Sequence, residues 1–186
     1  TNLLCFGDSN GTIDIEVDGG TPDVNNGEYT YLWTTTNGVI PSGTDTNQDL
    51  NGLVAGDYIV TVIDSNNCIM IEEYTIIEPT ELNVSASVIE ISCYGESDAS
   101  IDITVTGGVP DGFGNYTYLW NTTNITQDLN GLGPGLYSLL VTDSNGCEES
   151  IDVDVIEYPP IEFDVDIDQD GLINSSYNYS QYVCAG

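Results

Sequence analysis

Residues 13–17 read Ile-Asp-Ile-Glu-Val, and this stretch decides the fold of the chain. Apolar and acidic side chains alternate along it, as is typical of a β-strand with one buried and one exposed face. Residues 101–105, Ile-Asp-Ile-Thr-Val, repeat the alternation. Further strand-like runs lie at residues 59–63, 69–77, 139–141 and 151–156, and no segment shows a helical period. The sequence therefore predicts an all-β protein.

Turn-forming residues separate these runs. Gly-Gly-x-Pro-Asp occurs at residues 19–23 and 107–111, and Asp-Ser-Asn-x-Cys occurs at residues 64–68 and 143–147. In the second motif the fourth residue is Asn or Gly, the residue types that most readily adopt the positive φ of a tight hairpin. Hairpins of this kind predict antiparallel β-sandwiches.

The motifs recur in the same order, so the chain contains an internal repeat. Each copy begins with Cys-x-Gly, continues with Tyr-Thr-Tyr-Leu-Trp and Gly-x-Tyr, and reaches Asp-Ser-Asn-x-Cys. We predict a first repeat at residues 1–78 with an incomplete N-terminal strand, a complete second repeat at 79–158, and the start of a third at 159–186. Self-similarity of this kind indicates an array of modules.

Aromatic residues at matched positions predict the core of each repeat. Trp33 and Trp120 end the Tyr-x-Tyr-Leu-Trp strands, and we expect each to anchor its own core. Tyr58 and Tyr137, in Gly-x-Tyr, are placed like the tyrosine corner of a sandwich. We assign all four residues structural roles.

The charge of the chain excludes several classes of function. It contains 31 Asp and Glu but no Lys, Arg or His, for a formal net charge of −31. Nucleic acids and anionic membrane surfaces are excluded as partners because both require cationic side chains. Without His or Lys the chain cannot form a Ser-His or Cys-His pair or a Schiff base, so we predict that it is not an enzyme. No apolar run approaches the length of a membrane span, so we expect no direct membrane insertion.

Five cysteines predict disulfide bonds and an oxidising compartment. They are Cys5, Cys68, Cys93, Cys147 and Cys184. Two cysteines share an end of a sandwich when an even number of strands separates them, and we count four strand-like runs between those of each repeat. We therefore predict pairing within repeats, which joins Cys5 to Cys68 and Cys93 to Cys147 and leaves the partner of Cys184 open.

The segment that leads to Cys184 is longer than the corresponding segment before Cys93, and its insertion is acidic. Asp166, Asp168, Asp170 and Asn174 follow the spacing of an EF-type calcium loop, although Tyr177 stands where that loop has its bidentate carboxylate. The same residues also fit a plain strand with an acidic outer face that ends in an Asp-Gly turn. Both interpretations stay open, and calcium is the cofactor that the first one implies.

The order of motifs resembles the SprB repeat, which recurs in very large surface adhesins of gliding Bacteroidota. The motifs that carry the resemblance are Cys-x-Gly, Ile-x-Ile-x-Val, Gly-Gly-x-Pro, Tyr-x-Tyr-x-Trp, Asp-Leu-x-Gly-Leu, Gly-x-Tyr and Asp-Ser-Asn-Gly-Cys, and together they cover most of residues 1–158. The first copy departs from the last motif at Asn67. The resemblance implies tandem immunoglobulin-like or PKD-like antiparallel β-sandwich repeats and export by the type IX secretion route.

From the array and the resemblance we predict a segment of an extracellular adhesin stalk at the cell surface, linked to gliding motility or surface adhesion. Its partners would be neighbouring repeats, with surface polysaccharide or the gliding and secretion machinery as further candidates. Two alternatives remain. The chain could be a calcium-dependent carbohydrate-binding or ligand-binding module, or a filament subunit completed by strand exchange.

Overall fold

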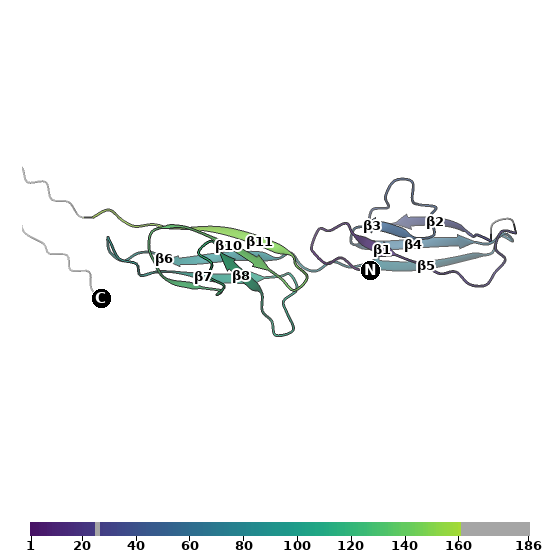
Figure 1. Ribbon diagram of the computed structural model, residues 1–186. Coiled ribbons are helices and arrows are strands. Elements are labelled where there is room, and N and C mark those ends of the chain that lie inside the picture. The colour runs from purple at the N-terminus through teal and green to yellow at the C-terminus, as the bar shows by residue number, and fades with distance from the viewer. Residues whose placement is uncertain (25–26, 161–186) are drawn as a thin grey trace, which may run out of the picture. The chain divides into compact units, whose positions relative to one another are not determined.

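The computed structural model describes residues 1–24 and 27–160. This part of the chain contains eleven β-strands, numbered as in Figure 1, and no helix. It divides into two compact units that do not follow the repeats. The first unit comprises Thr1–Asn83, Val105–Thr117 and Val141–Glu149, so it includes loops of the second repeat as well as the whole first repeat. The second unit comprises Val84–Thr104, Tyr118–Leu140 and, at the end of the described part of the chain, residues 150–160.

The first repeat is an antiparallel sandwich of five strands. They are β1 (Gly11–Ile13), β2 (Thr30–Thr35), β3 (Leu50–Leu53), β4 (Gly56–Ile63) and β5 (Ile69–Ile76). One sheet has the order β1-β3 and the other has the order β2-β4-β5. All the pairings are antiparallel. The strands and their pairing confirm the prediction of an all-β protein with antiparallel sheets.

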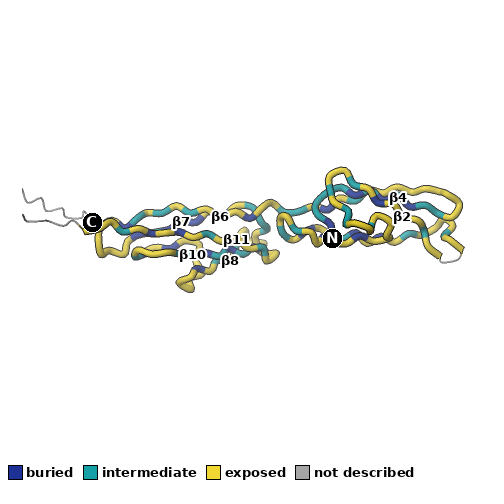
Figure 2. The backbone as a smooth tube through the Cα atoms, turned by 90° about the horizontal axis from the view of Figure 1, so that it is seen from above, coloured by how far each residue is buried: buried dark blue, intermediate teal, exposed yellow. Residues whose placement is uncertain are grey.

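The two sheets enclose one apolar core. Buried and exposed residues alternate along the strands, as the banded backbone in Figure 2 shows. Trp33 of β2 is 2% exposed and packs against the ring of Tyr74 of β5 at a centroid distance of 6.0 Å. Around them lie the buried apolar residues Leu3, Ile13, Ile15, Tyr31, Leu50, Leu53, Tyr58, Val60, Val62 and Ile76.

Strand β1 is shorter than the alternation of residues 13–17 predicts. Ile15 is buried, so the alternation continues, but its backbone no longer joins a strand. The Ile15 N–H donates to the carboxylate of Asp49 at 3.0 Å, and its carbonyl accepts from the side-chain amide of Gln48 at 2.6 Å. Ile103 of the second repeat makes the same two bonds, to Asp128 and from Gln127, yet its strand continues because β6 pairs with the other edge. Strand β1 has no such second neighbour among the described strands, so it ends at Ile13.

The second repeat contains six strands. They are β6 (Asn83–Ile89), β7 (Ala99–Thr106), β8 (Thr117–Trp120), β9 (Leu129–Leu132), β10 (Gly135–Thr142) and β11 (Glu148–Val155). Their sheets have the orders β6-β7-β9 and β11-β10-β8. Strand β7 corresponds to β1, but it has β6 as a second neighbour, and it continues to Thr106.

The aromatic residues shared by the repeats make the same hydrogen bonds in both. The indole N–H of Trp33 donates to the Asn47 carbonyl at 2.8 Å, and that of Trp120 to the Thr126 carbonyl at 2.9 Å. The two predicted corner tyrosines each donate to a carbonyl four residues upstream. These bonds run from Tyr58 to Val54 at 2.9 Å and from Tyr137 to Gly133 at 3.0 Å. Each aromatic side chain thus fills a core and fixes a loop through its polar atom.

The direction of the strands places the two ends of the first sandwich. Strand β1 is antiparallel to β3, and β2 is antiparallel to β4. Only residues 54–55 separate β3 from β4, so β3 ends at the end of the sandwich where β4 begins. Gly11, the first residue of β1, lies at this same end, because a Cβ on it would contact both Leu53 and Ile76. Strands β2 and β3 therefore run in the same direction. The connection at residues 36–49 thus returns along part of the sandwich without forming a strand, and it reaches β3 at Leu50, which is opposite Ile13.

Candidate functional site: a disulfide between the repeats

A disulfide bond joins the first repeat to a hairpin of the second. Cys5 is bonded to Cys147 across a sequence separation of 142, with 5.6 Å between the Cα atoms. Both cysteines belong to the first compact unit. A Cα separation of this size is typical of disulfides.

The carboxylate of Asp143 builds the hairpin that presents Cys147. It accepts hydrogen bonds from the backbone N–H groups of Asn145 and Cys147, both at 2.9 Å. Its other oxygen accepts from the Val109 N–H at 2.8 Å, which ties the hairpin to the Gly-Gly-Val-Pro-Asp loop. Asp143 is 6% exposed, the one buried charged side chain among the described residues. This arrangement fixes the position of the cysteine relative to the loop.

Two further contacts accompany the disulfide. The side-chain amide of Asn145 donates to the Leu4 carbonyl at 2.8 Å, next to Cys5 in the sequence. The Gly108 N–H donates to the Thr80 carbonyl at 2.9 Å, at the end of the first repeat. The hairpin and the neighbouring loop of the second repeat therefore hold the end of the first repeat at separate points.

The prediction that Cys5 pairs with Cys68 within its repeat is wrong. Leu3 hydrogen bonds to Ile77, beyond the end of β5, whereas Cys68 directly precedes the start of β5. Strand β4, which separates these two ends, has eight residues and so spans about 23 Å. Cysteines at opposite ends cannot bond. Four strands do lie between these cysteines, but β3 has only four residues and is reached by a non-strand return at residues 36–49. Together they leave and regain the same end of the sandwich, so β4 carries the chain to the end opposite Cys5.

The remaining cysteines differ in state. Cys68 is an exposed free thiol, and Cys93 is disulfide-bonded. The pairing of Cys93 with Cys147 is wrong as well, because Cys147 is bonded to Cys5. Cys184 and the candidate calcium ligands Asp166, Asp168, Asp170 and Asn174 lie outside the described residues, so the calcium prediction stays a prediction.

The hairpin that carries Cys68 repeats the hydrogen bonds of the Cys147 hairpin. Asp64 accepts from the N–H groups of Asn66 at 2.9 Å and Cys68 at 2.8 Å, and from the Thr21 N–H at 3.0 Å. Asn67 has φ 65°, and Gly146 at the same place has φ 86°. Positive φ at this residue confirms the predicted turn. The role of the aspartate was missed, although Asp opens the motif in both copies.

Asp64→Asn is expected to destabilise the first repeat at neutral pH. The hydrogen bond from the Cys68 N–H, followed by those from Thr21 and Asn66, lowers the pKa of Asp64 against the opposing effect of burial. A lowered folded-state pKa stabilises the protein above the unfolded-state value of about 3.9, and this contribution is lost as the pH falls through the folded-state pKa. The urea midpoint of the variant should therefore lie below that of the parent at pH 7, and the difference should shrink in acid.

Asp14→Asn is the matched control for this titration, because Asp14 is exposed and the change in net charge is the same. Its urea midpoint should not fall at pH 7, since removing one of many repelling charges relieves repulsion. Equal midpoints for the two variants at pH 7 would contradict the role assigned to the Asp64 hydrogen bonds.

The second loop packs on the chain between the repeats, and two glycines allow this packing to be measured. A Cβ on Gly107, at φ +73°, would lie 1.8 Å from the Glu81 carbonyl oxygen. Gly19 is its equivalent, with φ +85°, and a Cβ there would meet nothing within 4 Å. Gly19→Ala should cost about 1 kcal/mol for positive φ alone. Gly107→Ala should cost about 1–3 kcal/mol more because the backbone must move. Urea unfolding measures the difference, and equal losses would contradict the close packing.

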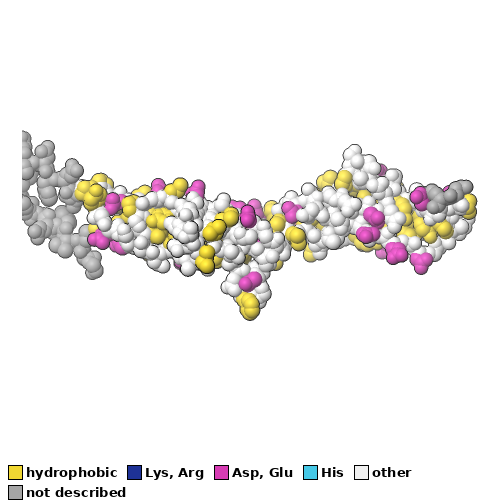
Figure 3. Space-filling model, viewed as in Figure 1, with side chains coloured by type: hydrophobic (Ala, Val, Ile, Leu, Met, Phe, Trp, Pro, Cys, Tyr) yellow, Lys and Arg dark blue, Asp and Glu magenta, His cyan; other side chains and the backbone are white. Residues whose placement is uncertain are grey.

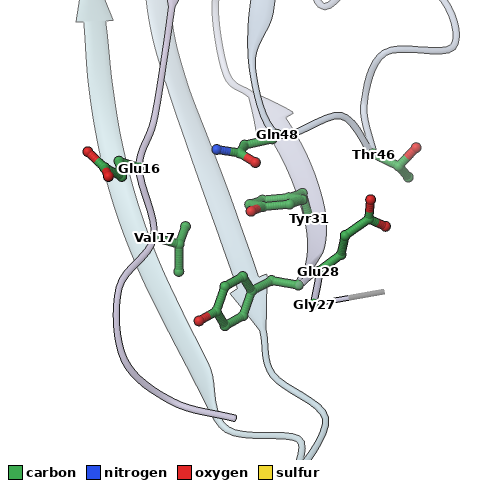
Figure 4. Close-up of a pocket in the computed structure, with 8 residues that line it drawn as sticks. Glu16, Val17, Gly27, Glu28, Tyr31, Thr46 and Gln48 are labelled. Atoms are coloured by element: carbon green, nitrogen blue, oxygen red, sulfur yellow. The ribbon is translucent and has the colours of Figure 1, made fainter. Parts of the chain in front are cut away.

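A hollow of about 390 Å³ lies in the first repeat (Figure 4). It is lined by Glu16, Val17, Gly27, Glu28, Tyr29, Tyr31, Thr46 and Gln48. Burial, followed by the negative charge of Asp49 and then by Tyr29 and Glu28, raises the pKa of Tyr31, which therefore stays protonated at neutral pH. Two carboxylates and neutral polar groups suit hydroxyl groups or cations and repel anions. The lining contains no nucleophile beside a base.

Acidic side chains are scattered over the face of the molecule that Figure 3 shows, among apolar and uncharged residues. No group of three or more His, Cys, Asp or Glu side chains within residues 1–24 and 27–160 is arranged to hold a metal ion. The described residues also include no helix long and apolar enough to cross a membrane.

Two solved structures resemble the chain weakly. One is the C-terminal 282-residue fragment of intimin in complex with the intimin-binding domain of the translocated intimin receptor, at 17% identity and a TM-score of 0.41. The match covers 77% of this chain and 56% of the fragment, so the chain spans about half the length of that structure. The other is the amphioxus IgVJ-C2 molecule, at 11% identity and a TM-score of 0.33, covering 81% of this chain and 98% of that one. A comparison with curated proteins found no match.

A family model identifies the repeat. The model of the SprB repeat matches residues 1–38 and again residues 85–124. Each matched stretch includes the first cysteine, the Gly-Gly-x-Pro loop and the Tyr-x-Tyr-Leu-Trp strand of one copy. The resemblance drawn from the motifs is thereby confirmed at two stretches of the chain, one in each repeat.

Proposed function

We propose that this chain is a load-bearing spacer in an extracellular surface protein of the adhesin type. The observation that carries the proposal is the Cys5–Cys147 disulfide, which joins one repeat to the next. Disulfides persist in oxidising compartments outside the cytoplasm, in agreement with an extracellular location. The two SprB repeats supply the modular architecture. The role of such a module is mechanical and non-catalytic.

The disulfide determines how the chain would carry tension. A force applied to both ends passes along the backbone to Cys5, crosses the sulfur–sulfur bond and leaves through Cys147. The backbone between these two cysteines bears no tension while the bond is intact, even after its strands have unfolded. A spacer built in this way keeps its length under loads that would extend an unlinked pair of domains.

Single-molecule pulling tests the proposal. The chain is held by its two ends and unfolded with and without dithiothreitol. Reduction should add up to about 480 Å of contour length, because a separation of 142 residues is released at about 3.4 Å per residue. The Cys68→Ser variant should behave like the parent, since Cys68 is a free thiol. Equal contour lengths in the oxidised and reduced states would overturn the proposal.

The finer role that we propose is a stalk holding an adhesive or anchoring domain away from the cell, in a protein of gliding motility or surface adhesion exported by the type IX route. Support comes from the SprB repeats and from the absence of basic residues, which removes the cleavage sites of Lys- and Arg-specific proteases. Affinity for surface polysaccharide would then come from other domains or from many weak contacts. Shortening the array in the producing cell should weaken adhesion without abolishing secretion.

One observation favours completion by a strand of another chain as a second candidate function. Among the described strands β1 pairs with β3 alone, whereas its counterpart β7 pairs with both β6 and β9. A hollow of about 300 Å³ lies beside β1 and is lined by Thr12, Ile13, Tyr74 and Ile76, and also by Thr1 and Asn2. The Thr12 N–H donates to the Thr1 carbonyl, and Thr1 corresponds to Ile89, so a strand from another chain would have to match the residues before Ile89. A peptide of residues 81–88, which contains most of β6, should bind here if strand exchange occurs. A scrambled peptide is the control.

The calcium-dependent ligand-binding alternative remains a prediction. A glycan array with and without chelator separates it from the spacer. A spacer gives no glycan signal, whereas a lectin gives a defined signal that chelator removes.

A further inference from the structure

The cysteine at the end of the hairpin is a free thiol in the first repeat, whereas the equivalent cysteine of the second repeat is in a disulfide. Cys68 is exposed and free, and Cys147 is bonded to Cys5. Both cysteines occupy the last position of Asp-Ser-Asn-x-Cys. The bonded copy shows what kind of group this hairpin binds, namely the first cysteine of the repeat that comes before it in the chain.

The two hairpins hold their cysteines alike. In each, the aspartate N–H donates to the cysteine carbonyl, at 3.1 Å from Asp64 to Cys68 and at 3.0 Å from Asp143 to Cys147. In each, the serine hydroxyl donates to the carbonyl of the adjacent loop, at 2.9 Å from Ser65 and 2.8 Å from Ser144. The thiol of Cys68 therefore has the setting that allows Cys147 to bond.

The Asn residues of the two hairpins have different acceptors, and Val109 of the second repeat has no hydroxyl where the first repeat has Thr21. Asn145 donates its side-chain amide to the Leu4 carbonyl of the first repeat. Asn66 donates instead to the Thr21 hydroxyl of its own repeat, at 2.9 Å. Asn66 sits two residues before Cys68, as Asn145 sits two residues before Cys147.

The partner of Cys68 must come from outside the first sandwich. Cys5 lies at the opposite end, about 23 Å away along β4, and it is already bonded. The pattern of the observed disulfide runs from the first cysteine of one repeat to the hairpin cysteine of the following repeat. For Cys68 that pattern requires the first cysteine of a repeat that precedes residue 1.

We propose that Cys68 forms a disulfide with the first cysteine of a preceding copy of this repeat, so that the junction before the first repeat is stapled in the same way as the junction after it. The two thiols lose two protons and two electrons, which a disulfide oxidant takes up as two thiols. With glutathione disulfide as the oxidant, one protein disulfide and two molecules of glutathione are formed. No other partner is needed.

The proposed bond makes the staples overlap. A staple that ends at Cys68 begins in the preceding repeat and so encloses Cys5, where the next staple begins before continuing to Cys147. Every peptide bond between the first cysteine of the preceding copy and Cys147 then lies inside at least one of these two staples. A single cut in the backbone of this stretch separates no fragment while the disulfides remain oxidised.

The test places a leading copy of residues 1–88 directly before the full chain. Ile89 of the second repeat corresponds to Thr1, as Cys93 corresponds to Cys5, so this fusion preserves the spacing of the repeats. The leading copy carries Phe6→Tyr, the residue found at Tyr94, and Met70→Leu, so that its cysteine peptides differ in mass from those of the chain. The protein is oxidised with glutathione disulfide, labelled with N-ethylmaleimide, digested with a Glu-specific protease and mapped without reduction.

We expect Cys5 of the leading copy to be linked to Cys68 of the chain, and the maleimide label to lie on Cys68 of the leading copy. In the unfused chain the label should lie on Cys68 itself. With Cys68→Ser in the chain, Cys5 of the leading copy should become labelled. A label on Cys68 of the chain in the folded fusion would overturn the proposal, as would a bond between Cys5 and Cys68 within the leading copy.

A second variant keeps the proposal testable if the fusion fails to fold. Cys147→Ser in the unfused chain frees Cys5, whose place in the first sandwich forbids a bond to its own Cys68. Glutathione disulfide should then join chains head to tail through Cys5 and Cys68, giving oligomers on a non-reducing gel. Monomers with an internal Cys5–Cys68 bond would contradict the proposal. Pulling on the unfused chain tests the Cys5–Cys147 bond alone. The spacer function can therefore be refuted without refuting the proposed Cys68 disulfide, and the Cys68 disulfide can be refuted without refuting the spacer.

Discussion

Trp33→Ala is expected to unfold most of the first repeat at 25 °C. Trp33 is 2% exposed, and its indole N–H is bonded to the Asn47 carbonyl. Replacing a buried Trp by Ala costs about 3–5 kcal/mol, which is comparable to the whole stability of a small domain. Trp120→Ala is the matched variant in the second repeat, where Trp120 is 1% exposed.

The chain has two Trp residues, so each variant keeps one fluorescent reporter in the other repeat. In urea, Trp120 fluorescence of Trp33→Ala should report the second repeat while circular dichroism reports the loss of the first. Trp33→Phe should retain most of the stability, because most of the buried apolar volume remains. A urea midpoint for Trp33→Ala equal to that of the parent would show that Trp33 is not the anchor of its core.

The fold was predictable where one physical rule acted alone. Alternation located β4, β5, β7, β10 and β11, and Asp-Ser-Asn-x-Cys located the hairpins. Strands β3 and β9 were not predicted, because both consist of Leu-Asn-Gly-Leu, whose internal Gly hides the alternation. The end of β1 was predicted too late, since alternation shows which side chains are buried and cannot show that β1 lacks the second neighbouring strand that β7 has in β6.

The candidate site was less predictable because it depends on chain direction. The cysteines themselves were identified, but their pairing depends on whether residues 36–49 cross the sandwich, and a crossing without a strand leaves no alternation to detect. The aspartates that open the hairpins carried a usable signal. Each recurs four residues before a cysteine, which is the spacing at which a carboxylate can accept from the cysteine N–H.

The double variant Cys5→Ser/Cys147→Ser is expected to lower the free energy of unfolding by about 4–5 kcal/mol. The disulfide closes a loop with a sequence separation of 142, and long loops restrict the unfolded chain the most. Removing both cysteines, and not one alone, leaves neither partner of the bond as a thiol that could exchange with Cys68. Urea unfolding under non-reducing conditions gives the loss, and Cys68→Ser should leave the midpoint unchanged because Cys68 is a free thiol. A parent and double variant of equal stability would contradict the prediction.

A denaturing gel separates a covalent staple from a merely stabilising contact. The connection at residues 36–49 contains Asp45 and Asp49 outside any strand, so an Asp-specific protease can cut it. Cys5 precedes the cut and Cys147 follows it, and the disulfide between them should keep the two fragments of the parent together in detergent without reductant. The double variant should separate into two bands at the same cut, as should the parent after reduction. Because detergent removes every non-covalent contact, this difference depends on the sulfur–sulfur bond alone, and a parent that also separates without reductant would show that Cys5 and Cys147 are not bonded.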